Sequence, residues 1–331
     1  MGENMRERLR RILEFYGFRE DIVEAFTSVP RERFTERSYP ESIVYSDSVI
    51  VTYDDGKTYS TSSQPSLMAS FMDWAGIKRG SRVLEIGGGT GYNASVMGKL
   101  VGEEGYVVSI EYEEKVCEIG KRNIENLGYK NVLIVCGDGY YGFSDKAPYD
   151  AILCTVGIDE IPRSWFKQLV NGGRIVAPLN VHITGRQPAF VFVKREGELL
   201  GVYKTETRFI MAGGRLGNLW ERNREKLSRL EGLEETGTLE IPFFKETSFL
   251  ELLELLTGRL TRDRGKYHYV GEEGFAVLEG RIWRVFGKVE ELYHLFNEWK
   301  NHNFPGFERI QIVLSFHTPP KRFFLKVTNL W

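Results

Sequence analysis

The sequence predicts an α/β fold: a doubly wound, mostly parallel sheet followed by a second, smaller α+β domain. Between residues 82 and 178, apolar runs of strand length alternate with amphipathic segments of helix length. Such βαβα alternation is typical of a parallel sheet covered by helices on both faces. The first strand leads directly into a glycine-rich turn at residues 87–91, and near residue 213 the alternation stops. These three observations define the architecture.

The individual elements follow from periodicity and turn signals. Residues 5–16, 21–28 and 66–75 predict three short helices, whereas the polar stretch 31–65 is rich in turns. A loop this long within a compact domain usually binds something. Strands are predicted at 82–86, 106–111, 132–136, 150–155 and 174–178, with helices at 92–100, 113–127 and 162–169. Strands near 188–195 and 199–210 would close the edge of the sheet.

Beyond the sheet the pattern changes. The charged segment 218–229 predicts a solvated connecting helix, and from about residue 238 the order becomes strand, helix, three strands, helix and two strands. The two helices are expected at 249–260 and 289–302, and a strand at 309–316. We therefore predict a first domain at 1–212, a charged connector at 213–237 and a small α+β domain of unknown role at 238–331.

Composition limits the function classes. The chain has 331 residues, enough for two domains, with 42% hydrophobic and 27% charged residues. Its net charge of −2 argues against a large nonspecific nucleic-acid footprint. The first residues lack the apolar stretch of a signal peptide, and no segment has the roughly 20 apolar residues of a membrane span. We expect a cytoplasmic protein with no nucleic-acid or membrane partner; the oligomeric state is not determined, and a monomer is favoured.

The three cysteines predict neither metal binding nor disulfides. Cys117, Cys136 and Cys154 lack the spacing of metal ligands, and Cys136 and Cys154 fall in predicted core strands. We interpret all three as buried thiols in a reducing cytoplasm and expect no metal cofactor.

The glycine turn narrows the ligand class. Gly87, Gly89 and Gly91 alternate, and Glu85 precedes the first of them by two residues. A dinucleotide fingerprint would need glycine where Tyr92 stands, and the Gly-Lys-Ser/Thr of a P-loop is missing. The turn follows the carboxyl end of a strand, where open α/β sheets bind ligands. The pattern resembles motif I of methyltransferases that use S-adenosylmethionine (SAM), so a Rossmann-like SAM-methyltransferase sheet is expected.

Two further strand ends fit the same ligand. Glu111 ends the second strand, 20 residues after Gly91, where an acid can accept hydrogen bonds from both ribose hydroxyls. Asp138 ends the third strand region and can accept from the adenine amino group, while Gly139 lets the backbone approach. Tyr112 could pack on the adenine or simply serve as a packing tyrosine. Glu85 is expected to act indirectly, by holding the glycine loop or the methionine amino group.

Several segments resemble one methyltransferase family. They include Val29-Pro30-Arg31-Glu32-Arg33-Phe34, Tyr45-Ser46-Asp47, Thr61-Ser62-Ser63-Gln64-Pro65, Gly137-Asp138-Gly139 and Pro148-Tyr149-Asp150. The first three resemble the Val-Pro-Arg, Tyr-x-Asp and Thr-Ile-Ser-x-Pro segments of protein-L-isoaspartate (D-aspartate) O-methyltransferases. The resemblance covers about residues 5–212, and similar C-terminal extensions occur in some thermophilic bacterial members. Two departures are Ser62 in place of isoleucine and Gly88 in place of a small hydroxyl residue, the latter implying a slightly looser loop.

The resemblance implies methyl transfer from SAM to the α-carboxylate of L-isoaspartyl residues in damaged proteins, which initiates repair; D-aspartyl residues are a second candidate substrate. A carboxylate is already anionic at pH 7 and needs no strong base. Ser63 carries over as the active-site serine and would orient the carboxylate by donating a hydrogen bond. Alternatively, or in addition, Ser63 could cap the helix that follows it. Peptide contacts are expected at Thr61, Ser62, Ser63, Gln64, Val156, Gly157 and Phe209.

Two other functions remain open at this point. One is a tRNA adenine methyltransferase of similar fold, although Thr155-Val156-Gly157 differs from the Asn/Asp-Pro-Pro-aromatic loop that holds a flipped base. The other is a SAM-binding module that regulates a partner through the C-terminal domain; Ser63 and the intact SAM motifs argue against it. Turnover on an isoaspartyl peptide would separate all three.

Overall fold

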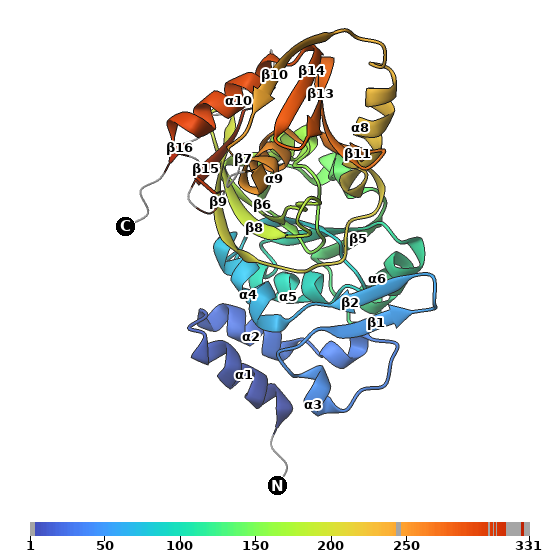
Figure 1. The fold of residues 1–331 in the computed structure, drawn as a ribbon. Helices are drawn as coiled ribbons and strands as arrows, with labels where there is room; N and C mark the ends of the chain where they lie inside the picture. Colours follow the sequence, from blue (N-terminus) through green and yellow to red (C-terminus); the bar gives the residue numbers. More distant parts are fainter. Residues whose placement is uncertain are drawn as a thin grey trace. The chain divides into compact units, whose positions relative to one another are not determined.

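The computed structural model describes residues 4–242, 246–303, 305, 306, 308, 310–315, 326 and 327 (Figure 1). The chain divides into two compact units. Unit 1 comprises Met1–Gly157, Pro162–Pro178 and Phe209–Gly214, and unit 2 comprises Ile158–Ile161, Leu179–Arg208 and Arg215–Trp331. The division of the chain at residues 212 and 238 stays a prediction about domains.

Unit 1 contains the predicted parallel sheet. Its strands are β3 (Arg82–Ile86), β4 (Tyr106–Glu111), β5 (Val132–Cys136), β6 (Tyr149–Cys154) and β7 (Leu169–Pro178), in the order β7-β6-β3-β4-β5. Neighbouring pairs run parallel. The inner strands β3 and β6 are buried almost throughout, as expected where helices cover both faces. The predicted α/β architecture is confirmed.

The strand order indicates where the sheet binds a ligand. Chain order runs from β3 through β4 to β5 on one side, and then returns to β6 and β7 on the other. Such a reversal leaves a crevice at the carboxyl ends of β3 and β6, where doubly wound sheets bind their ligands. The connecting helices are α4 (Pro65–Trp74), α5 (Tyr92–Val101), α6 (Glu114–Asn126) and α7 (Arg163–Gln168), with 3-10 turns η2 (Gly139–Tyr141) and η3 (Ser144–Lys146).

The stretch 31–65 is not one long loop. It follows α1 (Met5–Phe15) and α2 (Glu20–Ser28), and contains η1 (Arg31–Phe34), α3 (Glu41–Val44) and the antiparallel hairpin of β1 (Ile50–Asp54) and β2 (Tyr59–Ser62). The Thr90 hydroxyl donates to the Phe34 carbonyl at 2.6 Å, which ties η1 to the glycine turn. The N-terminal segment is therefore attached to the sheet at the carboxyl ends of its strands, next to the glycine turn.

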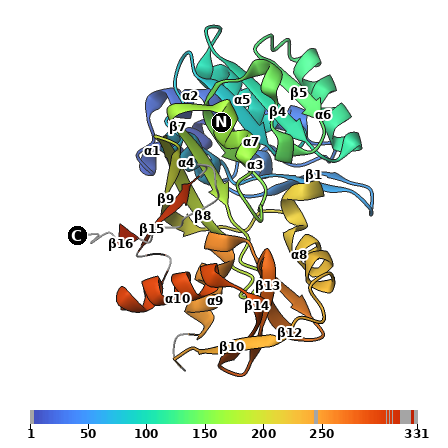
Figure 2. The same ribbon diagram turned by 90° about the horizontal axis from the view of Figure 1, so that it is seen from above.

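Unit 2 is built mainly from antiparallel strands. A five-stranded sheet has the order β10-β14-β13-β12-β11 (Figure 2). Its strands are β10 (Glu235–Glu240), β11 (Leu260–Asp263), β12 (Lys266–Val270), β13 (Glu273–Glu279) and β14 (Ile282–Lys288). The helical elements are η4 (Gly214–Gly217), α8 (Leu219–Ser228), α9 (Glu246–Thr257) and α10 (Glu290–Asn301), and further strands are β8 (Pro188–Arg195), β9 (Glu198–Glu206), β15 (Ile310–Ser315) and β16 (Lys326–Val327). In the described residues, no helix is long and apolar enough to cross a bilayer.

One prediction for this unit is wrong: four strands, not three, lie between α9 and α10. The strand predicted at 309–316 is present as β15, and it lies outside the five-stranded sheet: β15 pairs with β9, which also pairs with β8. The alternation of apolar residues identified β15 as a strand, but Ile312 and Val313 are both buried, so both of its faces are partly covered, and alternation carries no information about which strands pair with it. Residues 309 and 316, the two ends of that predicted strand, lie outside the described residues.

Candidate active site

The glycine turn needs its glycines for two separate reasons. Gly87, Gly89 and Gly91 have φ values of +92°, +54° and +94°, which disfavour any residue with a Cβ. Space is the second reason: a Cβ on Gly87 would lie 2.6 Å from Val156 Cγ1, and one on Gly88 would lie 2.2 Å from Ser109 Oγ. The expectation that Gly88 loosens the loop is therefore wrong, because Gly88 packs directly on β4.

The turn and the segment between β2 and α4 line one pocket. Its lining residues are Thr61, Ser62, Ser63, Met68, Gly87, Gly88, Gly89, Thr90, Tyr92, Asn93 and Thr155. The Thr155 hydroxyl donates to the Gly87 carbonyl at 2.6 Å, which fixes the loop after β6 against the turn. A Cβ on Gly89 would come within 3.8 Å of the Thr61 carbonyl oxygen. The structure thus brings the predicted serine segment and the predicted cofactor turn together.

Ser63 has a hydroxyl that makes no hydrogen bond within the described part of the chain, while its carbonyl accepts from Arg31 Nη2 at 3.0 Å. Helix α4 takes Gln64 as its N-cap residue, without a side-chain cap. The Ser66 N–H donates instead to Asp47 Oδ1 at 2.8 Å. The alternative reading of Ser63 as a helix cap is therefore wrong.

Glu85 lies beneath the pocket rather than in its wall. It is fully buried and accepts hydrogen bonds from Ser109 Oγ at 2.6 Å and from Asn93 Nδ2 at 2.7 Å. Burial raises the pKa of the Glu85 carboxyl to about 7, although these two donors favour its ionised form. Asn93 Oδ1 is buried and has no partner in the described structure. Sequence analysis missed Asn93, and its place in the first turn of α5, after the glycine motif, was the available signal.

We expect Glu85 to make stability depend on pH. The folded chain binds a proton that the unfolded chain lacks between about pH 4.5 and 7, so the free energy of unfolding falls as pH rises through this window. Glu85→Gln removes that titration and should reduce the loss between pH 5 and 8 by up to about 3 kcal/mol. Urea unfolding at four pH values, without SAM, measures this. An unchanged pH dependence in Glu85→Gln would contradict the prediction. Glu254→Gln is measured in the same way for comparison, because burial also raises the pKa of the Glu254 carboxyl to about 7.

Glu111 binds the glycine turn from the end of β4. Its Oε2 accepts from the Gly89 N–H at 2.7 Å, and its Oε1 accepts from the Glu113 N–H at 2.9 Å. Burial raises the pKa of the Glu111 carboxyl, and the two N–H donors oppose that shift. Tyr112 is 48% exposed, and Asp138 Oδ1 accepts from the Tyr140 N–H at 2.9 Å. The carboxylates after β4 and β5 are thus held by the backbone at the same edge of the sheet.

A glycine pair approaches these side chains. A Cβ on Gly213 would lie 2.3 Å from Tyr112 Cδ1, and one on Gly214 would lie 2.5 Å from Asp138 Oδ2. Gly214 also has a φ of +64°. Sequence analysis treated this Gly-Gly pair only as the border of a domain, although two adjacent glycines are also a signal for close backbone approach.

The other predicted peptide contacts also converge. The Gly157 N–H donates to the Ile210 carbonyl at 2.9 Å, and the Ala212 N–H donates to the Gly157 carbonyl at 2.8 Å. Phe209 packs on Phe71 of α4, with ring centroids 5.5 Å apart. The loop after β6 and the segment 209–212 therefore lie side by side, and their contact with a peptide stays a prediction.

Comparison with known proteins identifies the family. The family model described as Protein-L-isoaspartate(D-aspartate) O-methyltransferase matches residues 4–217, which is more than half of the chain. The chain belongs to this family. A second model, Protein-L-isoaspartyl O-methyltransferase, C-terminal domain, matches residues 218–319.

Individual relatives agree with the family match. A protein-L-isoaspartate O-methyltransferase of Thermotoga maritima is 50% identical over 313 residues, covering 95% of this chain and 97% of the relative. One from Methanococcus maripaludis is 36% identical over 203 residues, covering 61% of this chain and 92% of the relative. A solved protein-L-isoaspartate O-methyltransferase superposes with a TM-score of 0.91 at 48% identity, covering 98% and 99% of the two chains. The predicted enzyme class is confirmed: the chain is a methyltransferase that acts on L-isoaspartyl residues and initiates their repair.

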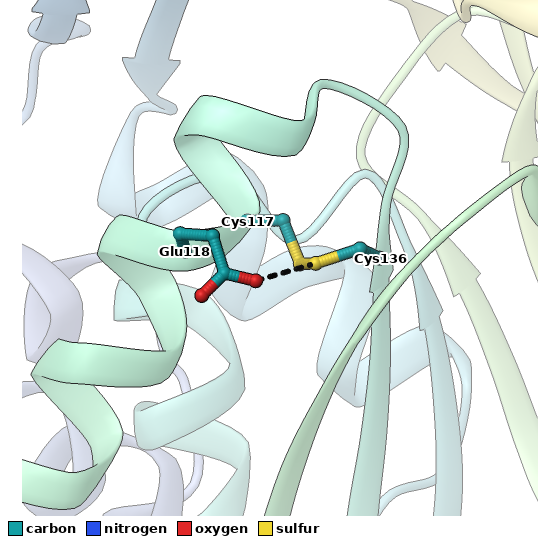
Figure 3. Close-up of side chains that lie close together, drawn as sticks. All are labelled: Cys117, Glu118 and Cys136. Atoms are coloured by element: carbon teal, nitrogen blue, oxygen red, sulfur yellow. Dashed lines mark hydrogen bonds between the residues drawn. A yellow bond between two sulfur atoms is a disulfide. The ribbon is translucent and has the colours of Figure 1, made fainter.

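The cysteines of this isoaspartyl methyltransferase require a correction. Cys117 on α6 and Cys136 at the end of β5 form a disulfide, with Cα atoms 5.5 Å apart, and only Cys154 is a free buried thiol among the described residues (Figure 3). The pairing arises because α6 packs on β5. Residues 19 apart in sequence give no sign of this neighbourhood. Glu118 Oε1 lies 3.4 Å from Cys136 Sγ. In the disulfide neither sulfur is a thiolate, which is the form that binds metal.

We expect the disulfide to contribute to stability. It closes a loop between residues 19 apart, and cross-links of this size stabilise by about 2–4 kcal/mol, mainly by restricting the unfolded chain. Reduction by a phosphine should lower the free energy of unfolding of the methyltransferase by that amount, measured by urea unfolding. Cys136→Ser should show the same loss and no further response to the reductant. Equal stability of the oxidised and reduced wild type would contradict the prediction.

Proposed function

We propose that the pocket between the glycine turn and the β2–α4 segment is where the methyl group passes from SAM to the α-carboxylate of an isoaspartyl residue. The observation that carries this is that Ser63 and the turn at 87–89 line the same pocket. The residues fit SAM: the turn at 87–91 has a left-handed backbone at three glycines and carries no side chain at them, and carboxylates stand at the end of β4 and after β5. Gly87, Gly89, Gly91, Glu111, Tyr112, Asp138 and Gly139 would bind SAM, with Glu85 acting through Asn93.

Bound SAM supplies a methyl group on a positively charged sulfur. The chain's own task is to hold the acceptor carboxylate in line with that group. The Ser63 hydroxyl would donate a hydrogen bond to one carboxylate oxygen and leave the other oriented for attack. Because the acceptor is already anionic at neutral pH, positioning rather than proton abstraction supplies most of the rate. This chemistry assigns no role to a metal, and we propose that activity persists in EDTA.

The peptide is proposed to bind along residues 61–64 and 156–157, with Phe209 nearby. The Ser62 hydroxyl accepts from Arg31, and the Gln64 amide donates to Asp47. Because these two side chains are already engaged, their contribution would come from the backbone. Backbone contacts suit an enzyme that must accept damage in many sequence contexts. Acceptance of D-aspartyl residues, a cytoplasmic location, a monomeric state and the lack of a nucleic-acid partner are further proposals, based on the sequence alone.

The decisive experiment compares an isoaspartyl peptide with its aspartyl twin of identical sequence, using SAM labelled in the methyl group. Label should enter only the isoaspartyl peptide, as a base-labile ester. Bulk tRNA serves as a third acceptor and should remain unlabelled. Labelling of tRNA, or equal labelling of both peptides, would overturn the proposed specificity. Binding of SAM without any turnover would favour the regulatory-module alternative.

A further inference from the structure

Arg31 is a fully buried guanidinium that lies behind the active-site segment. It donates six hydrogen bonds: Nε to Ser62 Oγ at 3.1 Å, Nη1 to the carbonyls of Val44 at 3.0 Å and Ser46 at 3.2 Å, and Nη2 to the carbonyls of Ser48 at 3.0 Å, Ser62 at 3.1 Å and Ser63 at 3.0 Å. In the described residues none of its hydrogen-bond partners is a carboxylate. A buried cation is costly unless it is hydrogen-bonded throughout, so this site is built around the guanidinium.

The six bonds join two parts of the chain. One part is the end of α3 with the loop that follows it, residues 44–48, and the other is the end of β2 with the residue that follows, Ser62 and Ser63. A planar fork with five N–H groups reaches these six acceptors because the two N–H groups of Nη2 are shared among three carbonyls, whereas a lysine ammonium has three donors on one atom. Burial lowers the pKa of Arg31, but its ordinary value is high enough that the group stays charged. The fork therefore fixes the backbone that carries the Ser63 hydroxyl.

Arg31 also contacts the side chain of Tyr92, a residue that lines the pocket. Its Cζ lies 5.4 Å from the centroid of the Tyr92 ring, within cation–π range. Tyr92 lines the pocket and is the first residue of α5, directly after the glycine turn. One guanidinium thus contacts the serine segment through hydrogen bonds and the cofactor turn through an aromatic face.

We propose that Arg31 is a positioning residue for methyl transfer, which sets the placement of the Ser63 hydroxyl relative to the glycine turn. The proposal rests on the role given to Ser63 under the proposed function. Arg31 acts through the Ser63 backbone and through Tyr92, and it does not line the pocket itself. Its loss should therefore lower kcat and raise KM for the peptide, while SAM affinity changes little.

The first test is Arg31→Lys, which keeps the charge and removes the fork. Displacing a catalytic group by about 1 Å can cost on the order of 10²-fold, so kcat should fall by about 10- to 100-fold, with the Kd of SAM within about threefold of wild type. The matched control is Arg82→Lys. Arg82 is the first residue of β3, at the end of the strand away from the turn, and it donates from Nε and Nη2 to Asp150 of β6. Its kcat should stay near wild type, and an equal fall in kcat in both variants would overturn the proposal.

The second test is rescue. In Arg31→Ala, millimolar guanidinium or ethylguanidinium should restore part of kcat, whereas Ser63→Ala should not respond. If Arg31→Ala does not fold, Arg31→Lys decides alone, and wild-type kcat in that variant would refute the inference. The double variant Arg31→Lys/Ser63→Ala separates the two proposals. Its kcat should be little lower than that of Ser63→Ala; independent, multiplicative losses would overturn the role of Arg31, and full activity of Ser63→Ala alone would overturn the role of Ser63.

Discussion

Replacing Ser63 with alanine should lower kcat for an isoaspartyl peptide by about 10²-fold, the order of loss expected when a reacting group is no longer held in position. The Ser63 hydroxyl lines the pocket with the glycine turn and makes no hydrogen bond within the described residues, so it is available to the acceptor carboxylate. Single-turnover methylation at saturating SAM measures the chemical step directly. The residual rate should remain well above background, because serine orients the carboxylate and does not attack.

Removal of the Ser63 hydroxyl should also affect catalysis without affecting folding. Because the hydroxyl has no hydrogen-bond partner among the described residues, Ser63→Ala should leave the thermal midpoint and the Kd of SAM unchanged. The matched control is Ser70→Ala on α4, whose hydroxyl donates to the Ser66 carbonyl and lies outside the pocket lining. Ser70→Ala should keep kcat within about twofold. Comparable rates for the two variants would remove Ser63 from the mechanism.

Glu111→Gln should raise the Kd of SAM by about 10²-fold. The proposed site gives this carboxylate two ribose hydroxyls, and each hydrogen bond to a charged acceptor contributes about 1.5–3 kcal/mol. The substitution also replaces one of the carboxylate oxygens that accept from the Gly89 and Glu113 N–H groups, which loosens the turn itself. Isothermal titration with SAM and with its demethylated product measures both affinities, and both should fall together because the ribose is common to the two ligands.

The control for Glu111 is Glu113→Gln, which removes a like charge two residues along the chain. Glu113 is exposed and its side chain does not cap α6. Its substitution should leave the Kd of SAM within about threefold. At saturating SAM the kcat of Glu111→Gln should recover to near wild type, since in the proposed arrangement Glu111 contacts the ribose and not the acceptor carboxylate. An unchanged Kd in Glu111→Gln would place the ribose elsewhere.

Local chemistry made much of unit 1 predictable. Strands β3, β4 and β5 occupy the predicted residues 82–86, 106–111 and 132–136, because buried parallel strands are short apolar runs bounded by turn residues. The glycine turn could also be predicted from the sequence, because its positive φ angles require glycine. Partnerships across the chain were not predictable in this way. The pairing of β15 with β9 and the Cys117–Cys136 disulfide both depend on which distant segments meet.

The site residues fall into the same two groups: some could be identified from the local sequence, and the roles of others depend on contacts between distant segments. The residue types at the strand ends identified the cofactor class, and the serine segment was found through its resemblance to a family. Sequence analysis named Arg31 only as part of a segment that resembles the family. Its six acceptors are backbone carbonyls and one serine hydroxyl, and the types of the residues that supply them do not indicate a buried guanidinium. Asn93 was missed for a similar reason, since its importance comes from the buried carboxylate beneath it.

The approach of Gly213 and Gly214 to Tyr112 and Asp138 has a practical consequence for anyone who wants to express residues 1–212 without the rest of the chain. A truncation at residue 212 removes backbone that packs on the proposed adenine site, and leaves more of an aromatic ring and of a carboxylate exposed to solvent. Weak cofactor retention in such a fragment would say nothing about the part of unit 2 that the truncation also removes, which begins at Arg215. An expression boundary drawn after residue 217, where the first family match ends, keeps that wall and gives the fragment a fair comparison with the full chain.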